Sequence, residues 1–231
     1  MPSQYKIHYR FRFHNGETIE IPLLLDEDTL TLLPLSGHAP PAWTETALHQ
    51  CKGCPLDPGT HSHCPIAVHL SWIVEIFHDH NSYDEVSVEV IDGRRSYLKE
   101  TSLQDGLGSL VGIIMASGGC PVLEPLRPMV RFHLPFASLE ETEFRMVSMY
   151  LVAQYIRLKR GGHPDWSLDG LQAIYDRVQA VNKYFADRIR SASRSDAGVN
   201  AIVILDCFAR AVPFAIRTMM RDYEKYFDSY S

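Results

Sequence analysis

The sequence predicts an α+β fold, in which two N-terminal hairpins form a small antiparallel sheet packed with helices and a C-terminal helical bundle follows. Two observations predict this architecture. Apolar residues alternate in short runs before residue 102, with turn-forming pairs between the runs, and they recur at helical spacing through the second half of the chain. Strands that precede a series of helices are typical of α+β proteins.

The first hairpin is expected within residues 5–24. Every second side chain from Tyr5 to Phe13 is aromatic or aliphatic, as in a strand with one buried face. Asn15-Gly16 follows and favours a type I′ turn, because both central residues of that turn must accept a positive φ. The residues after this pair are predicted to return as the second strand.

The second hairpin is expected over residues 86–101. Alternating valines run from Val86 to Val90, and Asp92-Gly93 supplies the turn. The two hairpins are separated by a predicted helix. We therefore expect them to join into one four-stranded antiparallel sheet.

Five helices are predicted from the 3.6-residue spacing of apolar side chains. The clearest start signal is the capping box formed by Ser138 and Glu141. The glycines of the second helix, Gly106 among them, suggest close packing of its backbone against a neighbour. The five expected helices cover residues 65–80, 102–117, 138–160, a stretch from Ser167 onward, and a stretch from about residue 196 toward the C-terminus, with a break at Pro213.

The sequence predicts two regions: an α+β region, residues 1–136, and a helical region, residues 137–231. We expect the two regions to pack together as one unit. Apolar seams on the two long helices of the second region are interpreted as core positions. The same helices could also bind a protein partner or a second copy of the chain. The expected seam residues are Phe144, Val147, Leu151, Tyr155 and Leu158 on one helix and Leu171, Ile174, Val178, Val181 and Phe185 on the other.

Composition excludes several classes of protein. The 231 residues are 45% hydrophobic and 22% charged, which is typical of a globular protein rather than a disordered one. A net charge of −6 gives no reason to expect nucleic acid as a partner. No stretch is apolar enough to span a membrane, and no secretory signal is visible, so we expect a cytoplasmic protein. Cytosolic thiols stay reduced, which favours metal binding or chemistry over disulfides.

The cysteines carry the main functional signal. Cys51, Cys54 and Cys64 fall within fourteen residues, and Cys120 follows a Gly-Gly turn after a predicted helix. Cys-x-x-Cys allows two thiolates to bind one centre through a tight turn. Cys64 is expected at a helix N-cap, where the backbone amides and the helix dipole favour a thiolate. The sequence therefore predicts that these four residues are the ligands of one metal site.

An iron–sulfur cluster, with [4Fe–4S] as the favoured form, is the leading interpretation of this set. Proline follows Cys54, Cys64 and Cys120, and Cys-Pro occurs in some cluster-binding sequences. One Cys-x-x-Cys pair with two separate cysteines also differs from the two matched pairs of many zinc sites. Zinc is the alternative, since His61 or His63 could replace Cys120 in a local Cys3His site.

The loop from Cys51 to Cys64 is polar and proline-rich and has few apolar side chains. We therefore expect a metal to organise it. The alternative interpretation is a turn that binds no metal. Cys207 lies among apolar residues and is interpreted as a core residue. A thiol enzyme that uses Cys120, with His133 as its base, is a further hypothesis.

Other polar groups favour structural roles. His78 and His80 are expected to hydrogen-bond the exposed carbonyls at the end of a helix. His133 is interpreted as a buried, hydrogen-bonded histidine rather than as part of a site. The acidic residues that begin the helix at Ser138 fit the helix dipole, so we assign them no catalytic function; they are Glu140, Glu141 and Glu143.

The cysteine segments resemble a bacterial family of uncharacterised proteins. The similarity is carried by the segment from Gln50 to Leu56, by Cys64-Pro65-Ile66-Ala67, and by Ser117-Gly118-Gly119-Cys120-Pro121. Pro128-Met129 and the segment from Phe132 to Phe136 extend it, so that it covers most of the chain. The resemblance implies no known activity and supplies no catalytic residues.

The sequence therefore predicts a cytoplasmic metalloprotein whose four-cysteine site serves electron transfer or redox sensing with a redox partner. The alternative is a non-enzymatic scaffold in which zinc joins the sheet to the helices and the C-terminal helices bind a partner or form a homo-oligomer. Whether the protein is an enzyme is left open.

Overall fold

The computed structural model of the chain describes residues 3–34, 39–192 and 223–230. The helix expected from about residue 196, its break at Pro213, and Cys207 lie outside the described residues. Two short 3-10 helices, η3 (Glu224–Tyr226) and η4 (Asp228–Tyr230), belong to the last described stretch.

The predicted four-stranded antiparallel sheet is present, with strand order β2-β1-β3-β4. Its strands are β1 (Gln4–Phe13), β2 (Thr18–Asp26), β3 (Glu85–Ile91) and β4 (Ser96–Ser102). The two hairpins join where β1 pairs with β3, and Phe11 there stands opposite Val88. The alternating apolar side chains of β1, β2 and β3 form one buried face. The opposite face carries charged pairs, among them Arg10 with Glu20 and with Glu89.

The turn of the first hairpin differs from the prediction. Gly16 has a positive φ of 90°, but Asn15 is not among the residues with positive φ, so the turn is not type I′. The amide of Phe13 donates to the carbonyl of Glu17, and the amide of Gly16 donates to the carbonyl of Phe13. These bonds enclose a three-residue loop that needs the left-handed conformation only at its last position, where glycine accepts it without strain.

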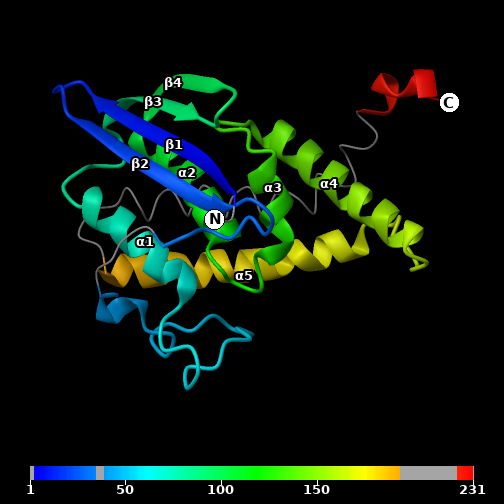
Figure 1. Ribbon diagram of the computed structural model, residues 1–231, viewed down its shortest axis with the longest axis horizontal. Helices are drawn as coiled ribbons and strands as arrows, with labels where there is room; N and C mark the ends of the chain where they lie inside the picture. The colour runs from blue at the N-terminus through cyan, green and yellow to red at the C-terminus, as the bar shows by residue number, and fades with distance from the viewer. Residues whose placement is uncertain (1–2, 35–38, 193–222, 231) are drawn as a thin grey trace.

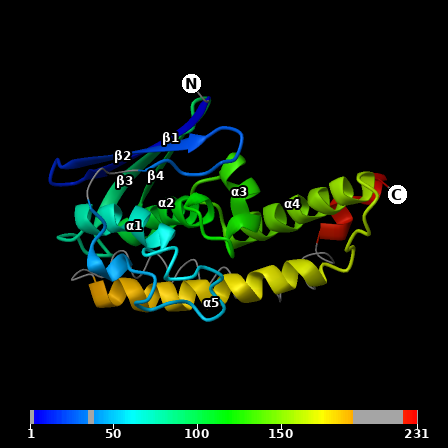
Figure 2. The ribbon, with the colours of Figure 1, turned by 60° about the horizontal axis from the view of Figure 1, so that its bottom comes forward.

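Two helices cover the buried face of the sheet (Figure 2). Helix α1 (Pro65–Ile76) begins after its N-cap Cys64 and has proline in its first turn. It ends four residues earlier than predicted, because the ring of His78 bonds the carbonyl of Glu75 at 2.7 Å and so takes over one of the last carbonyls. Helix α2 (Leu103–Ser117) is capped by the side chain of Ser102.

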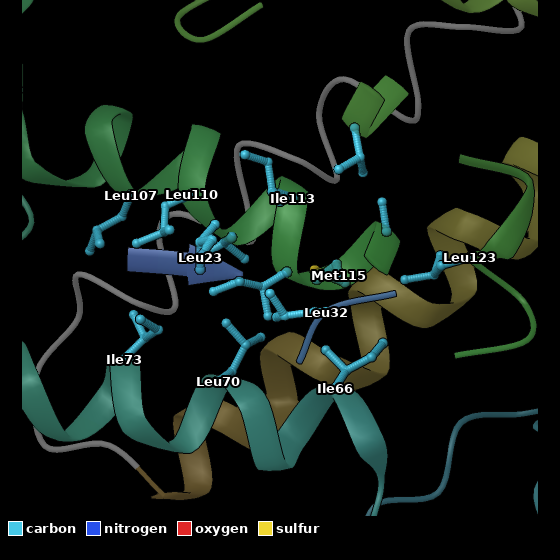
Figure 3. Close-up of a cluster of buried hydrophobic side chains, with 14 of the residues drawn as sticks. Leu23, Leu32, Ile66, Leu70, Ile73, Leu107, Leu110, Ile113, Met115 and Leu123 are labelled. Atoms are coloured by element: carbon cyan, nitrogen blue, oxygen red, sulfur yellow. The ribbon is translucent and has the colours of Figure 1, made fainter. Parts of the chain in front are cut away.

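Close packing of α2 on the sheet depends on Gly106, as the sequence suggested. A Cβ at this position would lie 2.8 Å from Cγ2 of Val88 and 3.1 Å from the ring of Phe11. The core between the sheet, α1 and α2 contains aliphatic side chains from each of these layers (Figure 3). Its labelled members include Leu23 from β2, Leu70 from α1 and Leu110 from α2.

The helical region contains α3 (Arg127–Arg131), which follows the 3-10 helix η2 (Glu124–Leu126), and two long helices. Helix α4 (Leu139–Lys159) has the predicted capping box, and helix α5 (Asp169–Ala192) runs beneath α1 and α2 (Figure 2). Buried residues on both sides of position 136 belong to one hydrophobic core. Within the described stretches, no helix is both long and apolar enough to cross a membrane.

The two predicted apolar seams have different outcomes. On α5, four of the five expected positions are buried and Ile174 is partly buried. Of the five seam positions on α4, Val147 is buried and Leu151 is partly buried against the core, whereas Phe144, Tyr155 and Leu158 are 43%, 52% and 46% exposed. The interpretation of the α4 seam as core was therefore wrong for these three positions, because much of α4 extends beyond the sheet and its covering helices (Figure 1).

Candidate metal site

The structure brings together the four cysteines singled out from the sequence. Cys51 and Cys54 lie in the loop before α1, Cys64 caps α1, and Cys120 follows α2. All four line one cavity of about 130 Å³. Helix α5 completes the wall with mostly apolar side chains, including Val181 and Phe185. Thiols from three separate parts of the chain therefore face a common space.

Local backbone geometry explains how each cysteine reaches this cavity. Gly53, with a φ of 77°, allows a tight turn in which the amide of Cys54 donates to the carbonyl of Cys51 at 3.0 Å. Gly119, with a φ of 89°, turns the chain after α2 and lies against Pro65 at the start of α1. The end of α2 therefore meets the N-terminus of α1, which places Cys120 near Cys64.

Burial and mutual repulsion oppose ionisation of the thiols. The pKa of Cys51 is raised to about 12, first by desolvation and then by the other three cysteines. Desolvation also raises the pKa of Cys64 and of Cys120. Without a positive centre these thiols stay protonated at neutral pH, and a bound metal would displace their protons.

Backbone amides act against this desolvation. The amides of Ile66 and Ala67, in the first turn of α1, lower the pKa of Cys64. The amides of Val122 and Leu123 do the same for Cys120. Each of these cysteines therefore has fixed partial positive charge close to its sulfur, an arrangement that favours the thiolate form.

A buried arginine adds a full positive charge. Arg188 of α5 is only 2% exposed, and its guanidinium donates to the carbonyls of Trp43 and Glu45 at 2.8 and 2.9 Å. Among the described residues, no carboxylate forms an ion pair with it. Its charge lowers the pKa of both Cys51 and Cys64. Such a cation is complemented by negative charge on the sulfurs.

Arg188 was not predicted as a site residue, although its position in the apolar series of α5 could have indicated it. The apolar positions of α5 follow a heptad-like order, 171, 174, 178, 181 and 185, and residue 188 is the next position in that series. A charged residue at an expected core position is a candidate functional residue. Lys52 and Arg177 also line the cavity.

The expectation that a metal organises the cysteine loop needs correction, because Arg188 also contributes. Its hydrogen bonds to the carbonyls of Trp43 and Glu45 hold residues 43–45 against α5. The backbone of these residues in turn pairs with the end of the loop. Glu45 and His63 form an isolated antiparallel β-bridge, and the amide of Cys64 donates to the carbonyl of Thr44 at 2.8 Å. The loop therefore has protein contacts that hold its end in place.

The histidines considered as alternatives lie outside the cavity wall. His63 bonds the hydroxyl of Thr44 at 2.7 Å, and His61 is exposed and contacts Thr60. His133, considered as a base for Cys120, lies in a second cavity and bonds the hydroxyl of Tyr9 at 2.7 Å. Across residues 3–34, 39–192 and 223–230, no group of three or more His, Cys, Asp or Glu side chains is arranged to hold a metal ion as it stands.

The fold and the cavity together define an α+β protein in which four cysteines line one cavity against the long helix α5. Comparison with family models places the chain in a family described as a domain of unknown function (DUF6901), which matches residues 7–228. The chain belongs to this family, as the resemblance to uncharacterised proteins led us to expect. Neither the curated proteins nor the solved structures contain a match.

Proposed function

We propose that the chain is a cytoplasmic metalloprotein in which Cys51, Cys54, Cys64 and Cys120 hold an iron–sulfur cluster, with [4Fe–4S] as the favoured form. The observation that carries the proposal is the meeting of four thiols from three parts of the chain at one cavity. Four thiolates are the usual protein ligands of such a cluster. Electron transfer or redox sensing is the function we propose for it.

The size and polarity of the cavity support a cluster over a single ion. Its volume of about 130 Å³ is several times the roughly 30 Å³ that one water molecule takes in the liquid. A single zinc ion needs no such space, because its four ligands close directly around it. The apolar wall formed by Val181 and Phe185 would exclude water, which is one of the factors that set the potential of a cluster.

The surrounding charge supports an anionic group. A cluster with four thiolates carries net negative charge, and Arg188 is the nearby buried cation that has only backbone carbonyls as partners in the described chain. Lys52 and Arg177 add positive charge at the cavity wall. Electrostatic attraction of this kind favours the bound, deprotonated state of the sulfurs.

Access for electrons supports a redox function. The loop that carries Cys51 and Cys54 is largely exposed, including Lys52 and Gly53 between them. A cluster held in this cavity would lie beside the exposed loop residues Lys52 and Gly53, which line the same cavity. A redox partner could therefore approach it without rearrangement of the core.

The test is metal analysis of the full chain purified without oxygen. We expect a brown protein with iron and acid-labile sulfide in equal amounts, about four of each per chain, and visible absorption that bleaches on reduction. The four single variants C51S, C54S, C64S and C120S should each lose most of the iron. Cys207→Ser is the matched control and should keep it.

Three results would contradict the cluster. A colourless protein with one zinc per chain would favour the zinc scaffold instead. Protein that binds neither iron nor zinc under these conditions would leave the four residues as free thiols. If C120S retained full metal content while H63A or H61A lost it, the site would be the local Cys3His arrangement.

The zinc scaffold is the second candidate, and the exposed face of α4 favours its interaction role. Tyr155 and Ile156 follow Val152 by about one turn of α4, and the three side chains are 52%, 44% and 58% exposed, respectively. An apolar stripe of this kind on a helix surface suits a protein partner or a second copy of the chain. Light scattering with and without a chelator tests this: a scaffold should lose its assembled state when zinc is removed, and V152D should weaken assembly without metal loss.

A further inference from the structure

A mainly apolar cavity lies away from the cysteines. It has a volume of about 410 Å³, which is within the range of small-molecule sites. Helix α2 forms one wall, α3 and residues 133–137 a second, and α4 and α5 close it. The proposed metal function does not use this space.

Apolar side chains form much of the cavity wall, and three of them are methionines. Met115, Met129 and Met146 come from three different helices, and Leu123 and Val178 also line the cavity. Methionine adapts its shape to irregular ligands, so a wall with several thioethers suits a flexible apolar group.

One cation faces this apolar space. Arg145 of α4 uses one nitrogen, Nη2, to donate to the carbonyls of Met129 and Phe132. Within the described stretches, no carboxylate pairs with it and its other guanidinium nitrogens have no hydrogen-bond partner. Desolvation lowers the pKa of Arg145, as expected for a cation that is held in an apolar environment. An anion at this position would remove that unfavourable state.

Neutral polar groups stand beside the guanidinium. Tyr175 of α5 is 5% exposed and lies close enough to Arg145 for the two groups to influence each other's pKa. Burial also lowers the pKa of His133 to about 3, so its ring is neutral and is held by the hydroxyl of Tyr9 at 2.7 Å. These groups can hydrogen-bond a ligand, while Arg145 supplies a half-buried positive charge.

Two exposed residues of opposite charge, Lys99 and Asp105, also line the cavity. Lys99 lies over the ring of Phe136 at 5.8 Å, and both residues line the cavity. Phe136 has a positive φ of 61°, a strained conformation that is held by a hydrogen bond from its amide to the hydroxyl of Ser109 at 2.9 Å. The strained residue thus places its ring in the cavity wall, beside a second cation.

We propose that the cavity between α2, α4 and α5 binds a small amphipathic carboxylate, whose anionic group pairs with Arg145 and whose apolar chain lies among the methionines. Within the described chain, the Nε–H and Nη1–H groups of Arg145 have no protein partner and can donate charged hydrogen bonds to a carboxylate. Tyr175 lines the same cavity, and its hydroxyl can donate a further hydrogen bond. This proposal does not depend on the metal site.

Calorimetry with decanoate and decanamide tests it, at concentrations below micelle formation and with protein stripped of bound lipid. The two probes share one chain and differ in charge. We expect decanoate to bind at least about tenfold more tightly, because a charged hydrogen bond contributes more than a neutral one. Arg145→Gln should remove this preference, whereas Arg157→Gln, an exposed arginine on the same helix, should preserve it.

A second readout locates the ligand and keeps the proposal testable if R145Q does not fold. With methyl-labelled methionine in the wild-type chain, decanoate should shift the signals of Met115, Met129 and Met146 and leave Met149, which lies outside the cavity wall, unchanged. Equal affinity for decanamide, absence of saturable binding, or equal losses in R145Q and R157Q would each overturn the proposal.

Discussion

Arg188 on α5 donates a hydrogen bond of 2.8 Å to the backbone carbonyl of Trp43, a residue 145 positions earlier in the chain. The same nitrogen donates to the carbonyl of Glu45 at 2.9 Å. This buried guanidinium therefore fixes the segment that leads into the cysteine loop and also places positive charge near Cys51 and Cys64. One side chain thus links the packing of α5 to the ionisation of the candidate ligands.

Replacement of Arg188 by methionine should affect both stability and metal content. Two partly buried carbonyls would lose their donor, at a cost of about 2–3 kcal/mol in the free energy of unfolding. Loss of the charge should also raise the pKa of Cys51 and Cys64 further and reduce iron content at neutral pH. Denaturant unfolding and metal analysis measure the two effects.

Arg190→Met is the matched control for this prediction. Arg190 is on the same helix but forms an exposed ion pair with Asp187, and exposed pairs contribute little to stability. We therefore expect a change within about 0.5 kcal/mol and full iron content. Equal effects of R188M and R190M would show that the buried charge has no special part in the site.

Gly119 should be needed for the metal as well as for the fold. Its φ of 89° is strained for any residue with a side chain, so Gly119→Ala should cost about 1–2 kcal/mol of stability. Relief of that strain would move Cys120 away from the N-terminus of α1 and lower iron content. Gly16→Ala is the control, because Gly16 has a φ of 90° and also has open space around its missing Cβ. G16A should match the stability loss without loss of iron; equal iron loss in both would refute the positional argument.

The sequence predicted the α+β class, the four strands and the helix boundaries well where local chemistry decides them. Ser138 and Glu141 form the predicted capping box, and Cys64 is the N-cap of α1. These features depend on residues close together in sequence. The prediction of a type I′ turn at Asn15-Gly16 was wrong, because loops of several lengths accept glycine in the same position.

Long-range features of the site were predicted only in part. The spacing of the cysteines indicated a shared centre, and the structure brings their side chains to one cavity. Periodicity marks position 188 as a core position, but it does not say which groups Arg188 meets there, because that depends on where α5 packs. The exposure of Phe144 and Tyr155 on α4 was missed for the same reason: an apolar stripe does not say whether another element covers it.

Gly106 should resist substitution, although alanine is the better helix former. A Cβ there would meet Val88 at 2.8 Å, which forces the sheet or the helix to shift. Overpacking of this kind costs about 1–3 kcal/mol, against a gain in helix propensity of about 1 kcal/mol. We expect net destabilisation of G106A in denaturant unfolding.

A double variant separates overpacking from other causes. Val88→Ala removes the methyl that the new Cβ would meet and leaves a cavity of its own. The free-energy losses of G106A and V88A should therefore sum to more than the loss in the double variant. Strictly additive losses would mean that the close contact between α2 and β3 is not what excludes a side chain at position 106.

His133 should contribute to acid unfolding. Its pKa is lowered to about 3 in the folded chain, first by desolvation and then by the charge of Arg145, whereas an unfolded histidine titrates near 6.5. A lowered pKa of this kind contributes stability that is complete above about pH 6.5 and is lost as the pH falls toward 3. The full loss is of the order of 5 kcal/mol.

His133→Gln keeps a hydrogen-bonding group near Tyr9 but does not titrate, so it should flatten the fall in stability over this range, even if the variant is less stable at pH 7. His14→Gln, which removes an exposed histidine, should keep the wild-type slope. Stability curves from denaturant unfolding at successive pH values measure the difference, and parallel curves for the wild type and H133Q would show that burial of this imidazole does not oppose its protonation.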